Sequence, residues 1–463
     1  MSDCTKVLVV GWDSAPPQEV FGDWRSSLPN LNGLMDRGVW GRLRSTDPPI
    51  TVPAWTSMLS SRNPGQLGFY GFRNRKAGSY ADKWIATSAA VKVDRIWNIL
   101  SREGKRSCVL NVPQTYPVSA IDGVMVADFL TPNNGSVYTY PASLKAEIER
   151  IADGYVIDCA NYRTEDKRGL LEQIHVMTEK RHKVATTLLR DYGTWDLFMA
   201  VEMGPDRLAH GFWQYVDPRH RKYRQGNPFE TCARDYYALL DRQLGELCDL
   251  AGPEAVVLVV SDHGTKRMDG SLNVNDWLIE EGLLVLRRQA EGVTRFREEN
   301  VDWSRTVAWA WGGYYARIFL NVAGREPQGI VVPEDYESVR DDLIRRLEAI
   351  PDDQGRRMST KALRPQDIYR GPQVGQAPDL IVYFDDLFWR AGQDIGHDTP
   401  YSFDTEIGPD DSVHDYDGIF VMARPGDRRG RLSGGLHCMD VAPTILHALG
   451  VAVPPAMEGR IIF

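Results

Sequence analysis

The sequence predicts an α/β fold in which a mostly parallel central sheet is flanked by helices and carries inserted cap segments. Two observations predict it. Short β-branched runs, each about one strand long, alternate along the chain with longer stretches whose apolar residues recur at helical spacing. Several of the short runs are apolar throughout, which is typical of parallel strands covered by helices on both faces.

The expected elements follow in order along the chain. Strands are expected over residues 6–10, 107–111, 123–128, 196–202, 255–261, 379–384 and 418–423. Crossover helices are expected over 91–103, 141–151, 169–192, 229–250 and 338–350. The pattern loosens over 131–168 and over 265–376. We therefore expect one catalytic domain over 1–463, with 131–168 as a possible cap segment and 265–376 as a possible cap or lid insertion.

Composition argues against several classes of protein. With 463 residues, of which 43% are hydrophobic, the chain can bury a large core. A net charge of -9 gives no general attraction to nucleic acid or to anionic membranes. The six cysteines form no CxxC pair, and the first apolar run is too short for a signal peptide or a spanning helix. We expect a soluble cytoplasmic protein with no nucleic-acid or membrane partner.

Acidic and histidine residues stand at or near the ends of apolar runs in four distant parts of the chain. They are Asp13, Asp206 with His210, Asp262 with His263, and His414. In an open α/β sheet the carboxyl ends of the strands collect on one edge, so such residues can converge on one crevice. This pattern predicts a site for two metal ions and, with it, a metal-dependent hydrolase.

A second signal lies at Thr51. Pro53 suits the first turn of a helix, so a helix is expected to begin near Val52 with Thr51 at its cap. By itself this arrangement is an ordinary N-cap. Beside a divalent metal, the same hydroxyl becomes a nucleophile with an anion site beneath it. The metal ligands elsewhere decide between the two interpretations.

Each pair of candidate ligands also has an ordinary structural explanation. Asp206 and His210 are four positions apart, which places them on one face of a helix, where they bind one ion or form a helical ion pair. Asp262 and His263 follow the most apolar run of the chain and could form a solvated turn. Ordinary turns rarely follow an unbroken run of Val and Leu so closely, so this pair is the stronger signal.

Seven motifs occur in a fixed order along nearly the whole chain. They are VLVVGWDSA, LPNLNGLMDRGVWGRL, PPITVPAWTSM, GPDRLAHGFW, VVSDHGT, HDYDGIFVMARPG and DVAPTILHALGV. Each motif is weak by itself, whereas all of them in this order are specific. Together they resemble the alkaline phosphatase superfamily, and in particular its type I phosphodiesterase and nucleotide pyrophosphatase branch.

The resemblance implies how the ligands divide between two divalent ions. One ion would be held by Asp13, Asp262, His263 and the Thr51 oxygen, and the second by Asp206, His210 and a later histidine. His414 fits the spacing of that last ligand, shortly before a strand. His437, just before the closing helix, ranks below it, and His397 ranks last. The mixed set of histidine and carboxylate is compatible with zinc, with manganese as the alternative.

The chemistry follows from these groups. A divalent ion lowers the pKa of a bound water from ~15.7 to about 7, and it acidifies a bound alcohol in the same way. Thr51 is therefore expected to attack phosphorus in line and to form a phosphothreonine, which water then releases. The expected substrate is a small phosphate ester.

The sequence departs from the family pattern near the nucleophile. Leu67 stands where many relatives carry a histidine, and Phe72 falls near the place of an asparagine that binds phosphoryl oxygen, with Asn74 close by. Asn74 is therefore a candidate substrate-binding residue. Lys266, just after Asp262 and His263, is another, although an exposed basic residue is the alternative.

The substrate class depends on what surrounds the nucleophile. No arginine stands next to Thr51, and Arg62 and Arg73 lie past the first turns of its helix, so the extra cation typical of a monoesterase is not evident. Aromatic residues that could hold a second ester group are Trp55, Phe69, Tyr70, Phe72, Phe212, Trp213, Trp309 and Trp311. We therefore expect a phosphodiesterase. A phosphomonoesterase or phosphomutase, or a non-catalytic metal-binding protein, is the alternative.

Overall fold

The centre of the molecule is a ten-stranded sheet. The computed structural model describes residues 6–426, 430–432 and 434–462. Five middle strands run parallel in the order β9, β1, β8, β5, β6, which confirms the predicted α/β class with a mostly parallel sheet. Antiparallel β21 joins β9, and β2 follows it. The strands are β1 Val7–Trp12, β2 Gly38–Arg44, β5 Ser107–Leu110, β6 Gly123–Val126, β7 Thr139–Tyr140, β8 Leu197–Glu202, β9 Val256–Val260, β21 Asp417–Ala423, β22 Gly430–Arg431 and β23 Leu436–His437.

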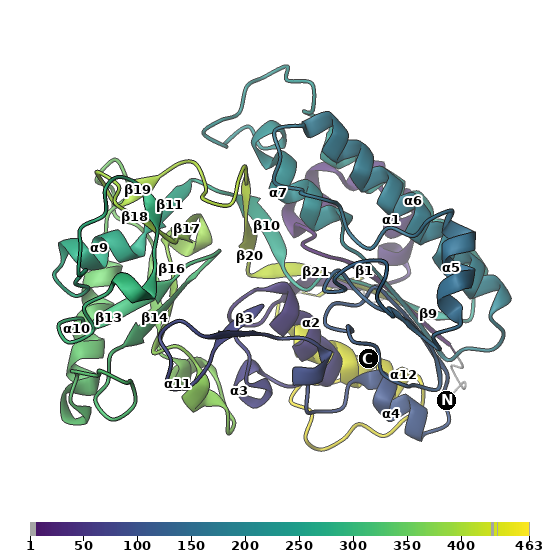
Figure 1. Ribbon diagram of the computed structural model, residues 1–463. Coiled ribbons are helices and arrows are strands. Elements are labelled where there is room, and N and C mark those ends of the chain that lie inside the picture. The colour runs from purple at the N-terminus through teal and green to yellow at the C-terminus, as the bar shows by residue number, and fades with distance from the viewer. Residues whose placement is uncertain (1–5, 427–429, 433, 463) are drawn as a thin grey trace.

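Helices cover both faces of this sheet because its strands are apolar on both sides (Figure 1). In β1, Leu8 and Val10 belong to the core shared with α1, α5, α6, α7 and α8, whereas Val7 and Val9 belong to the core shared with α2, α4 and α12. Burying each such side chain stabilises the fold by about 1.5–3 kcal/mol. These helices are α1 Pro29–Asp36, α2 Thr51–Ser60, α4 Ile96–Arg102, α5 Leu144–Ala152, α6 Lys167–Asp191, α7 Gly204–Val216, α8 Cys232–Ala251 and α12 Val441–Ala448. Within the described residues, no helix combines the length and the apolarity needed to cross a bilayer.

Between β9 and β21 the chain leaves the central sheet and builds a second lobe, on the left in Figure 1. This lobe has its own hydrophobic core and an antiparallel sheet in the order β13, β14, β16, β15. Antiparallel β10 and β20 lie where the chain enters and leaves the lobe. The strands here are β10 Gly264–Arg267, β11 Gly270–Asn273, β12 Thr294–Arg295, β13 Ala308–Trp311, β14 Ala316–Leu320, β15 Lys361–Leu363, β16 Leu380–Tyr383, β17 Trp389–Gly392, β18 Asp394–Ile395, β19 Tyr401–Ser402 and β20 Ser412–Asp415.

Short elements complete the fold around these two parts. A two-stranded hairpin, β3 Arg73–Arg75 with β4 Lys83–Ile85, follows α3 Pro64–Leu67. The remaining helices, α9 Val274–Glu280, α10 Tyr336–Glu348 and α11 Pro365–Ile368, lie in the second lobe.

The structure differs from the expectation for two strands. The strand expected over 379–384 is present as β16, but it pairs with β14 and β15 in the second lobe rather than joining the central sheet. A short apolar run would be buried equally in the central sheet and in the sheet of the second lobe. Its apolar pattern therefore does not identify the strands with which it pairs. β2 was not expected. Its burial alternates, with Arg42 and Arg44 less buried than their neighbours, as befits a strand near the sheet edge.

Candidate metal centre

Acidic residues follow β1 and β9 at the same edge of the sheet. The two strands pair in parallel register from Val7 with Val256 to Gly11 with Val260. Their carboxyl ends therefore lie side by side, where Asp13 follows β1 and Asp262 follows β9.

Asp13, Asp262 and His263 form one group of buried ligand atoms, all within 4.8 Å of one another. Asp13 Oδ2 accepts a hydrogen bond from Trp55 Nε1 at 2.7 Å, and Asp262 Oδ1 accepts one from the Ser14 amide at 3.2 Å. Their other oxygens, Asp13 Oδ1 and Asp262 Oδ2, have no hydrogen-bond partner among the described residues. A buried carboxylate oxygen without a partner costs free energy, so this group is suited to a cation.

His263 completes this first group with its Nε2 atom. Its Nδ1 donates to the carbonyl oxygen of Gly264 at 3.0 Å, which leaves the lone pair of the neutral ring on Nε2. Nε2 lies 3.2 Å from Asp262 Oδ2 and 3.4 Å from Thr51 Oγ1. Burial lowers the pKa of His263 to about 4, so the ring is neutral at pH 7 and free to bind a metal.

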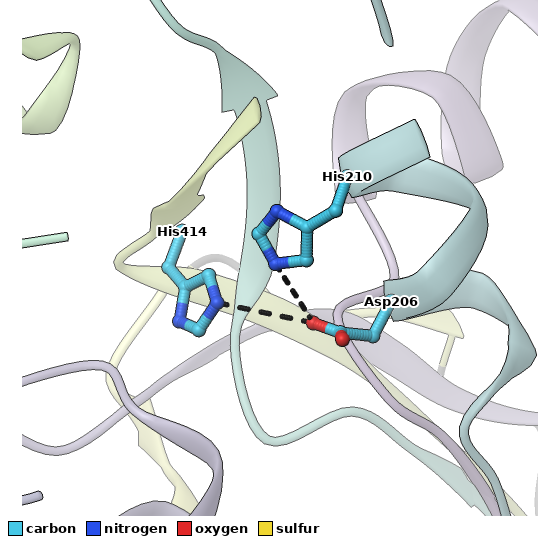
Figure 2. A group of neighbouring side chains, drawn as sticks. All are labelled: Asp206, His210 and His414. Carbon is cyan, nitrogen blue, oxygen red and sulfur yellow. Dashed lines mark ion pairs between the residues drawn. The ribbon is translucent and has the colours of Figure 1, made fainter. Parts of the chain in front are cut away.

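Asp206, His210 and His414 form a second group, drawn in Figure 2. Asp206 and His210 lie one turn apart on α7, and His414 comes from β20. Asp206 Oδ1 lies 3.3 Å from His210 Nε2 and 3.8 Å from His414 Nε2. This oxygen, too, has no hydrogen-bond partner among the described residues.

Both histidines of the second group are held by their Nδ1 atoms. His210 Nδ1 lies 2.8 Å from Asp410 Oδ1, and His414 Nδ1 donates to the carbonyl oxygen of Pro49 at 2.7 Å. Each ring therefore directs Nε2 toward Asp206. Such outer contacts fix the tautomer and the orientation of metal-binding histidines.

Asp410 is itself held by a small polar network. Its Oδ2 accepts hydrogen bonds from Arg163 Nε at 3.1 Å and from the Tyr314 hydroxyl at 2.9 Å. The Tyr314 ring stacks on His210 and on His414, with centroid distances of 4.9 Å and 4.4 Å. The second lobe thus supports both histidines through Tyr314.

The two groups adjoin each other, because the rings of His263 and His414 stack with centroids 3.8 Å apart. Burial raises the pKa of Asp13 well above its usual range, and Asp206 raises it further. Burial likewise raises the pKa of Asp262, with Asp13 adding to the effect. Carboxylates gathered without cations repel one another, and this donor set of carboxylate oxygens and imidazole nitrogens fits two divalent ions.

Thr51 lies beside the first group, but it is not the helix cap. The N-cap is Ile50, whose backbone is extended, and Thr51 is the first residue of α2 without a capping hydrogen bond. The predicted boundary is wrong by one residue because Pro53, which lacks an N–H, fits any of the first three helical positions. The buried Thr51 hydroxyl is therefore not engaged as a cap and faces His263 Nε2.

Close packing fixes α2 against β1. Trp55, one turn after Thr51, donates its indole N–H to Asp13. A Cβ atom at Gly11 would lie only 2.6 Å from the Trp55 ring, so β1 needs glycine at this position. The same contact thus sets the distance between α2, which begins at Thr51, and the strand that precedes Asp13.

The competing histidines lie outside both groups. His437 caps the short helical turn before α12, where its Nδ1 accepts a hydrogen bond from the Met439 amide. His397 Nδ1 lies 2.7 Å from Asp276 Oδ2 in the second lobe. The structure brings His414, and neither of these, to Asp206 and His210.

The two predicted substrate-binding residues have other surroundings. Asn74 is used by its own loop, since its Oδ1 accepts from the Tyr70 amide and its Nδ2 donates to the Gly71 carbonyl. Lys266 pairs with Asp415 at 2.8 Å. Neither lines the cavity over the metal centre. In β10, Thr265 is paired with His414, and the next residue points to the opposite face, which is why Lys266 faces away.

A cavity of about 500 Å³ opens over the centre, and Thr51, Asp206, His210 and His414 are among its lining residues. Of the aromatic residues expected around Thr51, Phe72 and Trp311 line this cavity. The other six are buried in hydrophobic packing or against β1, and they are Trp55, Phe69, Tyr70, Phe212, Trp213 and Trp309. The sequence did not point to the other aromatic lining residues, which are Phe129, Tyr162, Tyr314 and Tyr315.

The cavity also carries cations, although no arginine stands next to Thr51 in the sequence. Arg73 lines it, whereas Arg62 does not. The further cationic lining residues are Lys83, Arg163, Arg207, Arg295 and Arg317. Most of them come from loops and from the second lobe, where no periodic pattern or motif connects them to Thr51.

Comparisons with known proteins agree with this fold. Residues 7–416 match the profile of the family described as type I phosphodiesterase / nucleotide pyrophosphatase. Human ectonucleotide pyrophosphatase/phosphodiesterase 5 shares 14% identity with a TM-score of 0.55, covering 98% of this chain and 97% of that chain. Phosphonoacetate hydrolase from Sinorhizobium meliloti 1021, in complex with phosphonoformate, shares 18% identity with a TM-score of 0.62, covering 97% of this chain and 96% of that chain. An inactive variant of murine ectonucleotide pyrophosphatase/phosphodiesterase 5, in complex with AMP, shares 13% identity with a TM-score of 0.57, covering 97% of this chain and 96% of that chain. No curated protein sequence matches the chain.

Proposed function

The chain belongs to the type I phosphodiesterase / nucleotide pyrophosphatase family of phosphoester hydrolases, and we propose that it cleaves phosphate esters at two divalent metal ions with Thr51 as the nucleophile. One observation carries this proposal. Six buried side chains, from the segments that follow β1 and β9 and from α7 and β20, gather in two adjoining groups beside the Thr51 hydroxyl. Three of their carboxylate oxygens have no hydrogen-bond partner among the described residues, as expected of atoms reserved for cations.

Each group would hold one ion. Asp13, Asp262 and His263, with Thr51, form one set of ligands, and the second set is Asp206, His210 and His414. When bound, two divalent ions would neutralise charge on the phosphoryl group and acidify a coordinated hydroxyl. Zinc suits the mixed set of oxygen and imidazole donors, and manganese is the alternative.

The protein residues would carry out the remaining steps. Thr51 loses its hydroxyl proton to solvent, its oxygen forms a bond to phosphorus, and the ester oxygen leaves with the bonding electrons and takes up a proton. Water then attacks the phosphothreonine and regenerates the Thr51 hydroxyl. Because Thr51 begins α2, the free amides of the first turn are available to the phosphoryl oxygens.

The solved relatives support a small substrate that contains phosphorus. One is named a phosphonoacetate hydrolase and another is in complex with AMP. The family name includes phosphodiesters, so a phosphodiesterase remains the leading proposal, with a phosphomonoesterase or phosphomutase as the alternative. The ratio of kcat/KM for bis-p-nitrophenyl phosphate and p-nitrophenyl phosphate decides between them, and a clear preference for the monoester would overturn the diester proposal.

The nucleophile is tested on the same aryl esters with the metal-loaded chain. Thr51→Ala should abolish turnover and keep most of the bound metal, because Thr51 is one ligand among four in its set, whereas Thr51→Ser should retain part of the activity. Ser57→Ala is the matched control, since Ser57 is buried in the same helix and its hydroxyl has no partner among the described residues. Wild-type rates in Thr51→Ala would assign the attack to water. Metal retention with no turnover in the wild type would favour a non-catalytic metal-binding protein.

A further inference from the structure

Ser14 follows Asp13 in the turn after β1, and its backbone is left-handed, with a φ of 63°. Residues other than glycine rarely adopt this conformation, because it costs them free energy that glycine does not lose. The Ser14 side chain is buried, so its hydroxyl meets protein atoms rather than solvent. The chain therefore carries a strained serine where glycine would be relaxed, and the contacts of the hydroxyl show what the serine adds.

The backbone around Ser14 serves the first group of ligands. The Ser14 amide donates a hydrogen bond to Asp262 Oδ1 at 3.2 Å. The next amide, that of Ala15, donates to Ser261 Oγ at 2.9 Å, and this hydroxyl donates to the carbonyl oxygen of His263 at 2.6 Å. These contacts join the turn after β1 to the turn after β9. They use main-chain groups of the first turn, so a glycine in place of Ser14 could make them as well.

The Ser14 hydroxyl reaches further, to β10. Its Oγ lies 3.4 Å from the carbonyl oxygen of Gly264, the same oxygen that accepts the hydrogen bond from His263 Nδ1. It is also hydrogen-bonded to the Thr265 hydroxyl. Thr265 is buried, and in the pairing of β10 with β20 it lies opposite His414. These two strands lie between the central sheet and the second lobe (Figure 1). One hydroxyl thus contacts the support of His263 and the strand that pairs with the strand of His414.

The hydrogen bonds of this hydroxyl pair are mutually consistent. The Gly264 oxygen only accepts, so the Ser14 O–H can donate to it while the Thr265 O–H donates to Ser14 Oγ. Removing either hydroxyl would leave the other buried without this partner, which carries a desolvation cost. Outer contacts of this kind fix the orientation of metal-binding side chains.

We infer that Ser14 is a positioning residue whose hydroxyl, paired with that of Thr265, holds the two groups of metal ligands in place relative to each other. The inference rests on the proposed function for the two ions, and it gives Ser14 a role that its backbone alone could not fill. Because the hydroxyl pair ties the turn that begins at Asp13 to the strand opposite His414, its loss should loosen both groups.

The test removes the hydroxyl with and without the strain. Ser14→Gly relaxes the left-handed backbone, whereas Ser14→Ala keeps the strain. In chelated protein, Ser14→Gly should therefore unfold close to the wild-type temperature, and Ser14→Ala at a lower one. In both variants the affinity for zinc, measured by competition with a chelator, should fall about tenfold, the lower end of the range for lost supporting contacts. A merely structural role would change metal affinity only together with the unfolding temperature.

Each ligand group is also measured by itself. His414→Ala leaves the first group intact, and Asp262→Asn leaves the second group intact. Adding Ser14→Gly should lower the zinc affinity about tenfold in both backgrounds, because the same hydroxyl supports both groups. An unchanged affinity in either background would overturn the inference, since the hydroxyl would then serve one group or neither.

Variants of the partner hydroxyl locate the effect. Thr265→Val keeps the shape of the side chain and should lower the affinity as Ser14→Gly does, whereas Thr265→Ser should keep the wild-type affinity. The double variant Ser14→Gly/Thr265→Val should lose no more than either single variant, because both remove one contact. Additive losses would overturn the inference.

Ser61→Gly is the matched control. Ser61 is also buried and left-handed, with a φ of 54°, but it lies at the end of α2 away from Thr51. Its hydroxyl accepts a hydrogen bond from the Gly459 amide at 2.8 Å. Ser61→Gly should keep both zinc affinities at wild-type values, and a loss equal to that of Ser14→Gly would overturn the inference.

Metal binding and turnover together separate this inference from the proposed function. If the wild type binds two ions but hydrolyses no ester, and Ser14→Gly weakens both ions, the proposed function fails and the role of Ser14 stands. If esters are hydrolysed and Ser14→Gly binds both ions as tightly as the wild type, the proposed function stands and the inference fails. A wild type that binds no divalent ion would overturn both.

Discussion

At the scale of single residues, the decisive feature is a set of buried carboxylates with oxygens left unpaired. Asp13 and Asp262 have raised pKa values because they are buried and close to other carboxylates. The metal-free fold therefore holds protons on these groups at pH values where the unfolded chain has lost them. Because their ionisation opposes folding, the free energy of unfolding of the metal-free protein falls as the pH rises. The fall begins at about pH 4, the pKa of these groups in the unfolded chain, and continues through their higher pKa in the folded chain.

Replacing one of these carboxylates should raise the stability of the metal-free protein and lower the stability of the metal-loaded protein. In chelated protein, Asp262→Asn should unfold at a higher temperature than the wild type, by a margin that is small at pH 4 and grows toward neutral pH. With metal present, the same variant should be less stable than the wild type, because it lacks an anionic ligand. Thermal unfolding at several pH values measures both, with Asp404→Asn as an exposed control. A margin independent of pH would contradict the raised pKa.

The histidines give a second prediction for single residues. His414→Ala should lose close to one of the two bound ions, because its Nε2 faces Asp206 and its Nδ1 is already held by Pro49. His437→Ala should keep both ions and lose about 1 kcal/mol of stability, because its side chain serves as a cap. Metal analysis of the two purified variants makes the comparison. Loss of metal from His437→Ala and not from His414→Ala would reverse the assignment.

At the scale of elements, β20 and the turn before it support α7. Asp410 holds the ring of His210, and it receives hydrogen bonds from Arg163 and from Tyr314 of the second lobe. Asp410→Asn keeps the size of the side chain but removes the charge that orients the ring. We expect the affinity for the second ion to fall about 10–100-fold, the range seen when such supporting contacts are lost. Competition with a chelator measures the affinity, and Asp404→Asn, in the same segment, should leave it unchanged.

The sequence could predict the elements that follow simple periodic rules. Asp13 and Asp262 follow runs buried on both faces, and the parallel pairing of such runs brings their ends together. Asp206 and His210 share a helix face because four residues make about one turn. Pattern alone could therefore place these four residues, whereas the choice of His414 and the division into two ligand sets came from the resemblance to the family.

The supporting residues could not be predicted in this way. Arg163 and Tyr314 come from segments without periodic patterning, and their place beside Asp410 depends on how the second lobe packs. Lys266 was misplaced because alternation along β10 sends adjacent side chains to opposite faces. Aromatic residues were overcounted around the cavity because large apolar side chains are as common in the core, where Trp55 and Trp309 lie.

At the scale of the whole molecule, the candidate ligands join segments that are far apart in the chain. Asp13 follows β1 near the start of the chain and His414 lies on β20, about 400 residues later, and most of the second lobe lies between them in the sequence. An ion bound only by the folded state stabilises it by about 2.7 kcal/mol per site at a free concentration 100 times its Kd. Metal content should therefore control the unfolding of the whole chain as well as activity.

This gives a prediction for the intact protein. Zinc added to the chelated wild type should raise the unfolding temperature by several degrees, since each kcal/mol shifts it by roughly 2–4 °C in chains of about 150–250 residues and by less in longer ones. In Asp262→Asn/His414→Ala, which lacks one ligand from each group, zinc should raise it much less. Thr51→Ala should still respond, because its group keeps three ligands. Differential scanning calorimetry of the three proteins makes the comparison. Equal shifts in all three would place the ions elsewhere in the molecule, whereas a shift lost only in Asp262→Asn/His414→Ala would tie the stability of both lobes to this centre.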